Sequence, residues 1–341
     1  MFGGLGLNRS HGYIIMATFG FSFILVFSTV LKNLGVSTFE QLSFRLGFGF
    51  IILLAAMLFG GRRRFIHRKD VPFFLRIGFT YALFGLCGLA AIAFDTPIPV
   101  AVALVYTQPI FTAAISHLTG KEKVSGLKIA VILLGVVGAL LVSGLRATNQ
   151  QIQLGIVFPV LAGFFYAVYL WLKRQAPVEE YAPFQVLANT FMFAIPFLML
   201  AWLLFRNFSQ NSAFVGVTMP TSFQLILLFA FSLFSTVLPY GLLNYVKPKE
   251  VAPTTEGLLL LGDPLMHTLW ATLFFQEFIS EPQYLGAALI LISAALNLKI
   301  RTKTSTNSDA RKPDGRQFRL AVPCGTLPLA LCRYPWQLQG V

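Results

Sequence analysis

The sequence predicts an all-α membrane protein with about ten transmembrane helices, arranged as two inverted five-helix repeats. Three observations support this fold class. Hydrophobic residues make up 56% of the 341 residues and charged residues only 11%, whereas a soluble domain has about 25% charged residues. Ten apolar stretches are each long enough to cross a bilayer. Finally, Lys and Arg gather in alternate loops between these stretches.

The ten spans are separated by short clusters of glycine, proline and charged residues. A helix needs about 20 apolar residues to cross a hydrocarbon core of roughly 30 Å. Breakers such as Gly60–Arg64, Asp95–Pro97 and Gly120–Lys123 interrupt the apolar sequence. The first stretch is too long for a signal peptide and lacks a cleavage site. We expect spans at residues 13–31, 41–60, 71–93, 97–118, 126–145, 153–173, 183–205, 222–244, 252–274 and 283–300.

These spans divide the chain into four parts. Residues 1–12 form an N-terminal segment, residues 13–145 and 153–300 form the two five-helix repeats, and residues 301–341 form a tail. The tail is polar and basic over Thr302–Gln317 and lacks periodicity, so we expect disorder there. Contact of its basic residues with a lipid surface is the alternative.

The distribution of Lys and Arg predicts the orientation. With a cytoplasmic N-terminus, thirteen basic residues before the tail fall on the inside and three on the outside. This agrees with the positive-inside rule and places both termini in the cytoplasm, with the protein in the plasma (inner) membrane. The inside set is Arg9, Arg62, Arg63, Arg64, Arg68, Lys69, Lys121, Lys123, Lys128, Lys173, Arg174, Lys247 and Lys249; the outside set is Lys32, Arg146 and Arg206.

The net charge of +13 does not indicate a nucleic-acid partner, because the basic residues lie in loops rather than on one polar domain. Cys87 lies in a span, and Cys324 and Cys332 lie in the tail with no metal-ligand spacing. We therefore expect no metal and no cofactor. The expected partners are a small-molecule solute and membrane lipid.

A weak internal repeat relates the two halves. A shift of 155 residues places Leu104 on Leu259, Pro109 on Pro264 and Glu122 on Glu277. In both halves a helix with a central proline is followed by a glutamate and another helix. Because each half has an odd number of spans, the halves must insert with opposite topology, as in many secondary transporters.

These two segments resemble the signatures of the EamA-like family in the drug/metabolite transporter superfamily. The resemblance covers residues 11–300, and Arg45 resembles an arginine common in the second helix of that family. Val131 replaces a usual glycine, and Glu256 adds an acid where the first half has Ala101. The signature residues are Val105-Tyr106-Thr107-Gln108-Pro109-Ile110-Phe111 with Gly120-Lys121-Glu122, and Leu261-Gly262-Asp263-Pro264 with Phe275-Gln276-Glu277.

The resemblance implies a secondary transporter that moves a small organic metabolite or amino acid by alternating access. Export and proton coupling are included in this expectation, and the solute is left open. The sequence contains no H-E-x-x-H, G-x-S-x-G or Walker A motif. We therefore expect no enzyme. The alternatives are a membrane enzyme or lipid-handling protein, and a non-transporting membrane scaffold.

The ninth span contains the most informative ionisable residues. Glu256, Asp263 and His267 are spaced by seven and four residues and share one helix face. Asp263 lies roughly 16 Å from the cytoplasmic start of the span, near the midplane. Pro264 should kink the helix beside it. We predict that all three ionisable residues contact the solute. The alternatives are a structural Asp263–His267 pair, and a Glu256 that reaches cytoplasmic water.

Three further residues complete the predicted solute site. Tyr106 and Gln108 lie beside Pro109, the kink of the fourth span, at the same depth as Asp263. Arg45 lies about a turn inside the outer end of the second span. It either binds an anionic group of the solute or extends to the interface. Small residues near Gly138 and Gly286 indicate close helix contacts, within one chain or in a homodimer.

Overall fold

The described part of the chain is helical throughout. The computed structural model describes residues 8–59, 66–93, 98–142, 155–177, 180–208, 219–276 and 280–310, and these residues contain no strand. The α-helices are α1 (Arg9–Asn33), α2 (Thr38–Phe59), α3 (Val71–Ala93), α4 (Ile98–Val105), α5 (Gln108–Leu118), α6 (Gly126–Val142), α7 (Val157–Lys173), α8 (Pro183–Phe208), α10 (Ser222–Ser232), α11 (Leu238–Asn244), α12 (Pro253–Leu260), α13 (Gly262–Phe275) and α14 (Glu281–Ala310). Two short elements join them: the 3₁₀-helix η2 (Arg68–Asp70) and the π-helix η4 (Leu233–Val237).

The helices account for ten membrane spans, as the sequence predicts. Seven segments of the described chain are long and apolar enough to cross a bilayer: α1, α2, α3 with η2, α8, α10 to α11, α12 to α13, and α14. The shorter apolar helices α6 and α7 add two more. The tenth is the pair α4 and α5, which together cover the predicted fourth span. The all-α membrane fold is thereby confirmed.

Three of the spans are interrupted within the described residues. The fourth breaks at Tyr106 and Thr107, between α4 and α5, and the ninth breaks at Leu261, between α12 and α13. The 155-residue shift that relates the two halves places Tyr106 on Leu261, so these breaks are equivalent. The eighth span contains η4 followed by Pro239, an interruption that was not predicted from the sequence.

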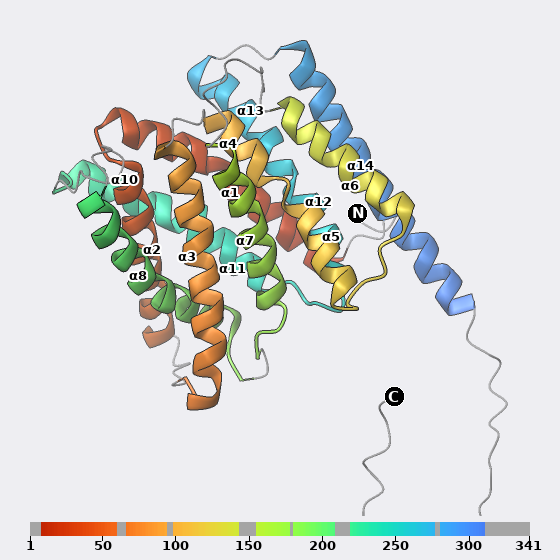
Figure 1. Ribbon diagram of the computed structural model, residues 1–341, viewed down its shortest axis with the longest axis horizontal. Helices are drawn as coiled ribbons and strands as arrows, with labels where there is room; N and C mark the ends of the chain where they lie inside the picture. Colours follow the sequence, from red (N-terminus) through yellow and green to blue (C-terminus); the bar gives the residue numbers. More distant parts are fainter. Residues whose placement is uncertain are drawn as a thin grey trace, which may run out of the picture. The chain divides into compact units, whose positions relative to one another are not determined.

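Aromatic side chains form the main core between α3, α7, α8 and α11. Tyr81 contacts Tyr169, Phe191 and Tyr240, with ring centroids 5.2–5.4 Å apart. The helix α3 packs against α7 and α8, and α1 packs against α11 and α13 (Figure 1). Because large buried aromatics supply much of the packing, this core holds together four helices, of which α3, α7 and α11 also line the candidate site.

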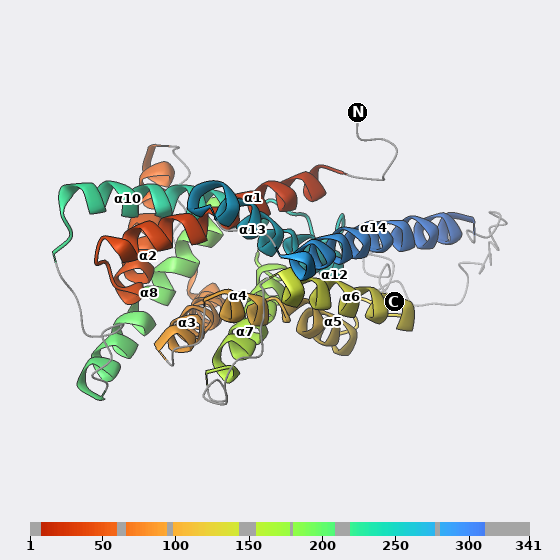
Figure 2. The same cartoon turned by 90° about the horizontal axis from the view of Figure 1, so that it is seen from above.

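Small residues bring α6 and α14 into close contact within the chain. A Cβ atom added to Gly138 would lie 2.8 Å from the Gly286 carbonyl oxygen, and one on Gly286 would lie 2.6 Å from the Gly138 carbonyl oxygen. Both views of the chain show these helices side by side (Figures 1 and 2). The predicted small-residue contact is therefore intrachain, and the open question of a homodimer does not depend on it.

The loops separate into two groups at opposite ends of the spans. At one end, Ser10 donates a hydrogen bond to Glu250, and Lys69 pairs with Glu180. We call this the 245–252 end, after the loop that contains Glu250. At the other end Gln224 donates to the Leu34 carbonyl, and we call this the 34–37 end. This alternation is what consecutive antiparallel spans produce.

The C-terminal segment differs from the prediction where it is described. The helix α14 continues to Ala310, beyond the predicted end of the last span at residue 300. No proline or glycine occurs between Thr302 and Ala310 to stop it. The remainder of the tail, 311–341, lies outside the described residues, as do Arg62–Arg64 and Glu277.

Candidate functional site

A cavity of about 260 Å³ lies between the helices of the first unit, residues Met1–Thr302. Its walls come from α1, α2, α3, α4, α7, α10, α11 and α13. It extends from buried Asp263 to exposed Lys32, so it opens toward the 34–37 end. Ligand pockets commonly measure about 300–1,000 Å³, so this central cavity suits a small solute.

A second hollow, of about 450 Å³, is larger but less suited to bind a polar solute. It lies between α2 and α8 and is lined mainly by apolar side chains. Its one charged residue, Glu40, accepts a hydrogen bond from the Ser37 backbone N–H at 2.7 Å. That carboxylate caps α2, so the central cavity is the better candidate.

The breaks in the fourth and ninth spans border the central cavity. Pro109 and Pro264 have no N–H to donate to the carbonyls four residues earlier, those of Val105 and Leu260. At the first break α7 approaches the freed backbone closely, because a Cβ atom on Gly163 would lie 2.7 Å from the Val105 carbonyl oxygen. The breaks place Tyr106 and Asp263 at the cavity wall.

Arg45 lies in the cavity wall rather than only at the membrane interface. Its guanidinium carbon stands 4.9 Å from the centre of the Phe231 ring, in cation–π geometry. The guanidinium also lies near the Tyr81 and Tyr240 hydroxyls. Its buried Nε has no hydrogen-bond partner, and no carboxylate of the described residues pairs with it. Arg45 thus offers an uncompensated cation to the cavity.

Asp263 and His267 also line the central cavity, one helical turn apart on α13. Their side chains are 3.6 Å apart, between Oδ1 and Nε2, which is too long for a hydrogen bond. Both atoms are buried without a partner among the described residues. The sequence left a structural Asp263–His267 pair as an alternative, and this weak contact leaves both groups available to a solute.

Tyr106 and Gln108 occupy different surroundings although they are two residues apart. Tyr106 is buried and lines the central cavity. Gln108 is fully buried outside the cavity lining, where its side-chain amide donates to the Thr112 hydroxyl. A Cβ atom on Gly257 would lie 3.3 Å from Gln108 Nε2. Gln108 therefore packs between the two broken spans and does not line the central cavity.

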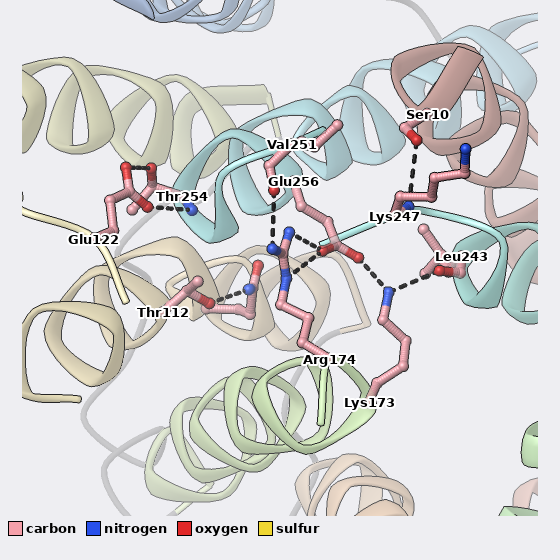
Figure 3. A network of polar contacts seen from close by, with 11 residues as sticks. Ser10, Thr112, Glu122, Lys173, Arg174, Leu243, Lys247, Val251, Thr254 and Glu256 are labelled. Carbon is pink, nitrogen blue, oxygen red and sulfur yellow. Dashed lines mark hydrogen bonds and ion pairs between the residues drawn. The ribbon is translucent and has the colours of Figure 1, made fainter. Parts of the chain in front are cut away.

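Glu256 lies apart from the central cavity, in a buried ion-pair cluster. Its carboxylate pairs with Lys173, and with Arg174 Nη2 at 2.6 Å. Lys173 also donates to the Leu243 carbonyl at 2.9 Å, and Arg174 Nη1 donates to the Val251 carbonyl at 2.9 Å (Figure 3). The Glu256 cluster, as we call these three charged residues, thus joins α7 to α12 and the loop before it.

A second contact supports the Glu256 cluster at the same end. Glu122 pairs with Lys128. It also accepts hydrogen bonds from Thr254, at 3.2 Å from the backbone N–H and 2.7 Å from the hydroxyl (Figure 3). Glu122 therefore caps the start of α12 from the other half of the chain. The central cavity opens at the 34–37 end, whereas these ion pairs lie at the 245–252 end.

Sequence reasoning missed the partners of Glu256 and the aromatic cavity wall. Lys173 and Arg174 were assigned only as basic residues of a loop, although their position at the end of an apolar span was visible. Tyr81 and Tyr240 line the cavity, but no pattern distinguishes them among 10 tyrosines and 35 phenylalanines. Their role depends on contacts between residues about 160 positions apart.

The two halves of the chain match one family model, that of the EamA-like transporter family, over residues 9–144 and 153–299. The chain belongs to the EamA-like transporter family. It is thus a multi-pass membrane protein of a transporter family, and the two matched segments agree with the predicted two-repeat organisation of the fold.

Several relatives of this EamA-like protein bear transporter names. An uncharacterised transporter of Archaeoglobus fulgidus is 27% identical over 77% of this chain and 88% of its own length. A probable amino-acid metabolite efflux pump of Escherichia coli K12 is 25% identical over 69% of this chain and 79% of its own length. A probable amino-acid metabolite efflux pump of Salmonella typhimurium is 22% identical over 86% of this chain and 96% of its own length.

A solved structure shares the fold of this EamA-like chain. It is described only as a crystal structure of a protein, and it matches with a TM-score of 0.71 at 16% identity, covering 86% of this chain and 98% of its own. A match at this identity supports the architecture and carries no information about the solute.

Proposed function

We propose that this EamA-like protein is a carrier that moves a small organic metabolite, of the amino-acid type, by alternating access. The observation that supports this most directly is the central cavity. It is open toward one end and bordered by two equivalent helix breaks. It contains Arg45, which has no carboxylate partner among the described residues, and Asp263, whose Oδ1 atom accepts no hydrogen bond there. Unpaired charges in a membrane interior are costly and are retained where they meet a solute or ion.

The amino-acid assignment rests on the size of the cavity and on the names of two relatives. A volume of about 260 Å³ accommodates a metabolite more readily than a larger drug. Two relatives are named as probable amino-acid metabolite efflux pumps. Outward transport is the direction that these names favour.

The orientation follows from the basic residues of the loops. We propose that the 245–252 end faces the cytoplasm of a cell whose plasma membrane holds the protein, with both termini inside. The cavity is then open to the outside. Cysteines introduced near Lys121 and Asn149 test this in intact cells: a membrane-impermeant thiol reagent should label only the second, and the reverse pattern excludes the orientation.

Alternating access requires that the closed end open. The Glu256 cluster holds α7 to α12 at that end, so inward opening must separate Glu256 from Lys173 and Arg174 or carry all three together. A closed 34–37 end would follow from movement of α13 against α1, which pack together. The two broken spans supply the joints for such movement.

We further propose that Asp263 couples transport to protons. The proton affinity of a buried carboxylate depends on its hydration and on nearby charges. Asp263 meets water from one side of the membrane in this state and from the other side after the change. A group whose proton affinity differs between two states links proton movement to the change of state.

The carrier proposal is tested by counterflow into proteoliposomes that contain the purified protein. Vesicles preloaded with unlabelled amino acids should accumulate the labelled compound transiently, and the rate should saturate. A linear, non-saturating flux without counterflow would instead indicate a channel. Chemical alteration of the added solute would indicate an enzyme, an activity that we do not propose because the family and its named relatives are transporters.

A further inference from the structure

Two opposite charges without partners line the same cavity. Arg45 from α2 has no carboxylate partner among the described residues, and the Oδ1 atom of Asp263 from α13 has no hydrogen-bond donor there. By contrast, the buried carboxylate of Glu256 is paired with two cations in the Glu256 cluster. The central cavity is where a solute has to complete the charge balance.

From this arrangement we propose that the central cavity selects dipolar ions, with Arg45 binding the carboxylate and Asp263 binding the ammonium group of one solute. The inference rests on the proposed carrier function and adds to it the charge pattern of the solute. It excludes amines without a carboxylate and carboxylic acids without an amine, although both are small metabolites.

Arg45 is suited to bind a carboxylate. A guanidinium presents several N–H donors in a plane that matches the two carboxylate oxygens. Phe231 lies 4.9 Å away and restricts the guanidinium position, and Nε still has no acceptor. The Ser232 hydroxyl donates to the Arg45 carbonyl at 2.7 Å and ties α2 to α10 there. A held cation with an unused donor is a preorganised anion site.

Asp263 is suited to bind an ammonium group. It lies in the first turn of α13, where the helix dipole favours a negative charge. Its Oδ1 atom faces His267 Nε2 at 3.6 Å without forming a hydrogen bond, and the Phe21 backbone lies beside the imidazole. An ammonium group would donate to both Asp263 and a neutral His267, which satisfies the two unpartnered atoms together.

The aromatic part of the cavity wall suits an apolar or aromatic side chain on the solute. Tyr81 and Tyr240 lie near Arg45, with their ring centroids 5.3 Å apart. The Tyr240 ring also contacts the Phe21 ring, and the Phe21 backbone lies beside His267. These contacts link the arginine end of the cavity to the aspartate end. Aromatic walls bind an apolar group by contact area, and they provide few polar groups to recognise a third charge.

A solute with a single charge would leave one of the two residues uncompensated. A buried charge without a partner is strongly unfavourable, so such a solute would have to bring a counter-ion or a proton with it. A dipolar ion needs neither. This difference predicts a reciprocal pattern. Without the Asp263 charge the protein should favour the carboxylic acid, which has no ammonium group, and without the Arg45 charge it should favour the amine, which has no carboxylate.

The experiment uses counterflow of labelled leucine in proteoliposomes, with two matched competitors. These are 3-methylbutylamine, which lacks the carboxylate, and 4-methylpentanoate, which lacks the amine; phenylalanine with phenethylamine and 3-phenylpropionate forms a second series. For the wild type, the amino acid should compete at least tenfold better than either analogue. In Asp263→Asn the acid should gain relative to the amino acid, and in Arg45→Gln the amine should gain.

Arg76→Gln and Glu281→Gln serve as controls, because both residues are exposed and lie outside the cavity lining. Both should keep the wild-type order of competitors. Each variant is first checked for a monodisperse elution profile and an unchanged melting temperature without solute. If Asp263→Asn fails this check, Asp263→Glu replaces it; this variant keeps the charge and should retain the amino-acid preference with weaker competition.

The possible results separate this inference from the carrier proposal. Saturable exchange in which an amine or an acid alone competes as well as the amino acid overturns the dipolar-ion inference and leaves the carrier intact. Loss of exchange in both charge variants without a reciprocal gain also overturns it. Absence of saturable exchange for every compound in the wild type overturns the carrier proposal as well.

Discussion

Asp263 and Glu256 lie seven residues apart on the same span. Both carboxylates are buried, but only that of Glu256 is neutralised by cations of the chain. Glu256 is enclosed by Lys173 and Arg174 and is 1% exposed. Asp263 is 3% exposed, yet its Oδ1 atom has no partner, and its neighbour His267 is too distant for a hydrogen bond. Burial is therefore similar at the two positions, and pairing is what differs.

This comparison gives a physical criterion for function within one membrane protein. A buried carboxylate whose partners are all supplied by the chain stabilises one arrangement of helices. A buried carboxylate without a partner is stable only while something else meets it, whether solute, water or a proton. This criterion supports the proposed solute contact of Asp263, and it supports a role for Glu256 in closing the 245–252 end.

The largest expected effect is that of Glu256→Gln. It leaves Lys173 and Arg174 buried without a counter-charge, which costs about 3–5 kcal/mol. The melting temperature should fall, and the 245–252 end should open. Opening is measured with Ser116→Cys, a buried position beside Glu256, in a background with the three native cysteines replaced. The reaction of this introduced thiol with a maleimide should accelerate at least tenfold in Glu256→Gln.

Glu281→Gln is the matched control for Glu256→Gln, because it neutralises an exposed acid. It should leave both the melting temperature and the reaction of the introduced thiol unchanged. If Glu256→Gln behaves in the same way as this control, the ion pairs do not close this end of the protein. Pairing would then not distinguish the role of Glu256 from that of Asp263.

The second effect concerns proton coupling at Asp263. Asp263→Asn keeps the shape and polarity of the side chain but cannot release a proton. A pH gradient should no longer drive accumulation of solute in proteoliposomes, whereas exchange at saturating solute should persist at a reduced rate. Accumulation at equal pH on both sides gives the baseline. A wild type that does not respond to a pH gradient would remove Asp263 from coupling and leave it as a solute contact.

A third, intermediate effect is expected from the two prolines. Pro109→Ala and Pro264→Ala each restore a backbone N–H, so a continuous helix becomes more favourable and the joint between the half-helices stiffens. We expect transport to fall several-fold while insertion into the membrane is unchanged, because insertion depends on hydrophobicity. Pro282→Ala at the start of α14 is the control. Full activity in both variants would show that transport does not require the prolines at the two helix breaks.

The smallest effect is expected from Glu250, a charged residue that is paired and only partly buried. The Ser10 hydroxyl and then Lys247 lower the pKa of the Glu250 carboxyl below its usual value. Such a group stabilises the fold above its ordinary pKa, and this contribution disappears as the pH falls through the lowered value. Glu250→Gln should therefore reduce the melting temperature slightly at pH 7 and not at pH 3. An equal reduction at both pH values would contradict the charge-based explanation.

The architecture could be predicted from the sequence because the bilayer restricts how a chain can fold. Span length, alternation of Lys and Arg and the paired proline motifs are all local, and they predicted ten spans that the helices confirm. Even the break at Leu261 follows from Pro264. The interruption at η4 was not predicted, although Pro239 lies two residues after it and leaves the Ser235 carbonyl within η4 without its helical N–H donor.

The candidate site was less accessible to sequence reasoning. Asp263, His267, Arg45 and Tyr106 were named from their depth and motifs, and they line one cavity. Glu256 shares a helix face with Asp263 by spacing, yet the break between α12 and α13 separates their surroundings. Whether it met water or a partner depended on α7, which is about 80 residues away in the chain. Helix periodicity cannot supply that information.

The π-helical turn η4 also has a consequence for the phase of the eighth span. Phe231 lies before this turn and Tyr240 after it, nine residues apart. In a regular α-helix, at about 100° per residue, two such residues point to opposite sides. Both nevertheless line the central cavity. The wider turn removes part of that angle, so one span presents two aromatic rings to one solute. Conversion of η4 to a regular helical turn would rotate one of these rings out of the cavity wall.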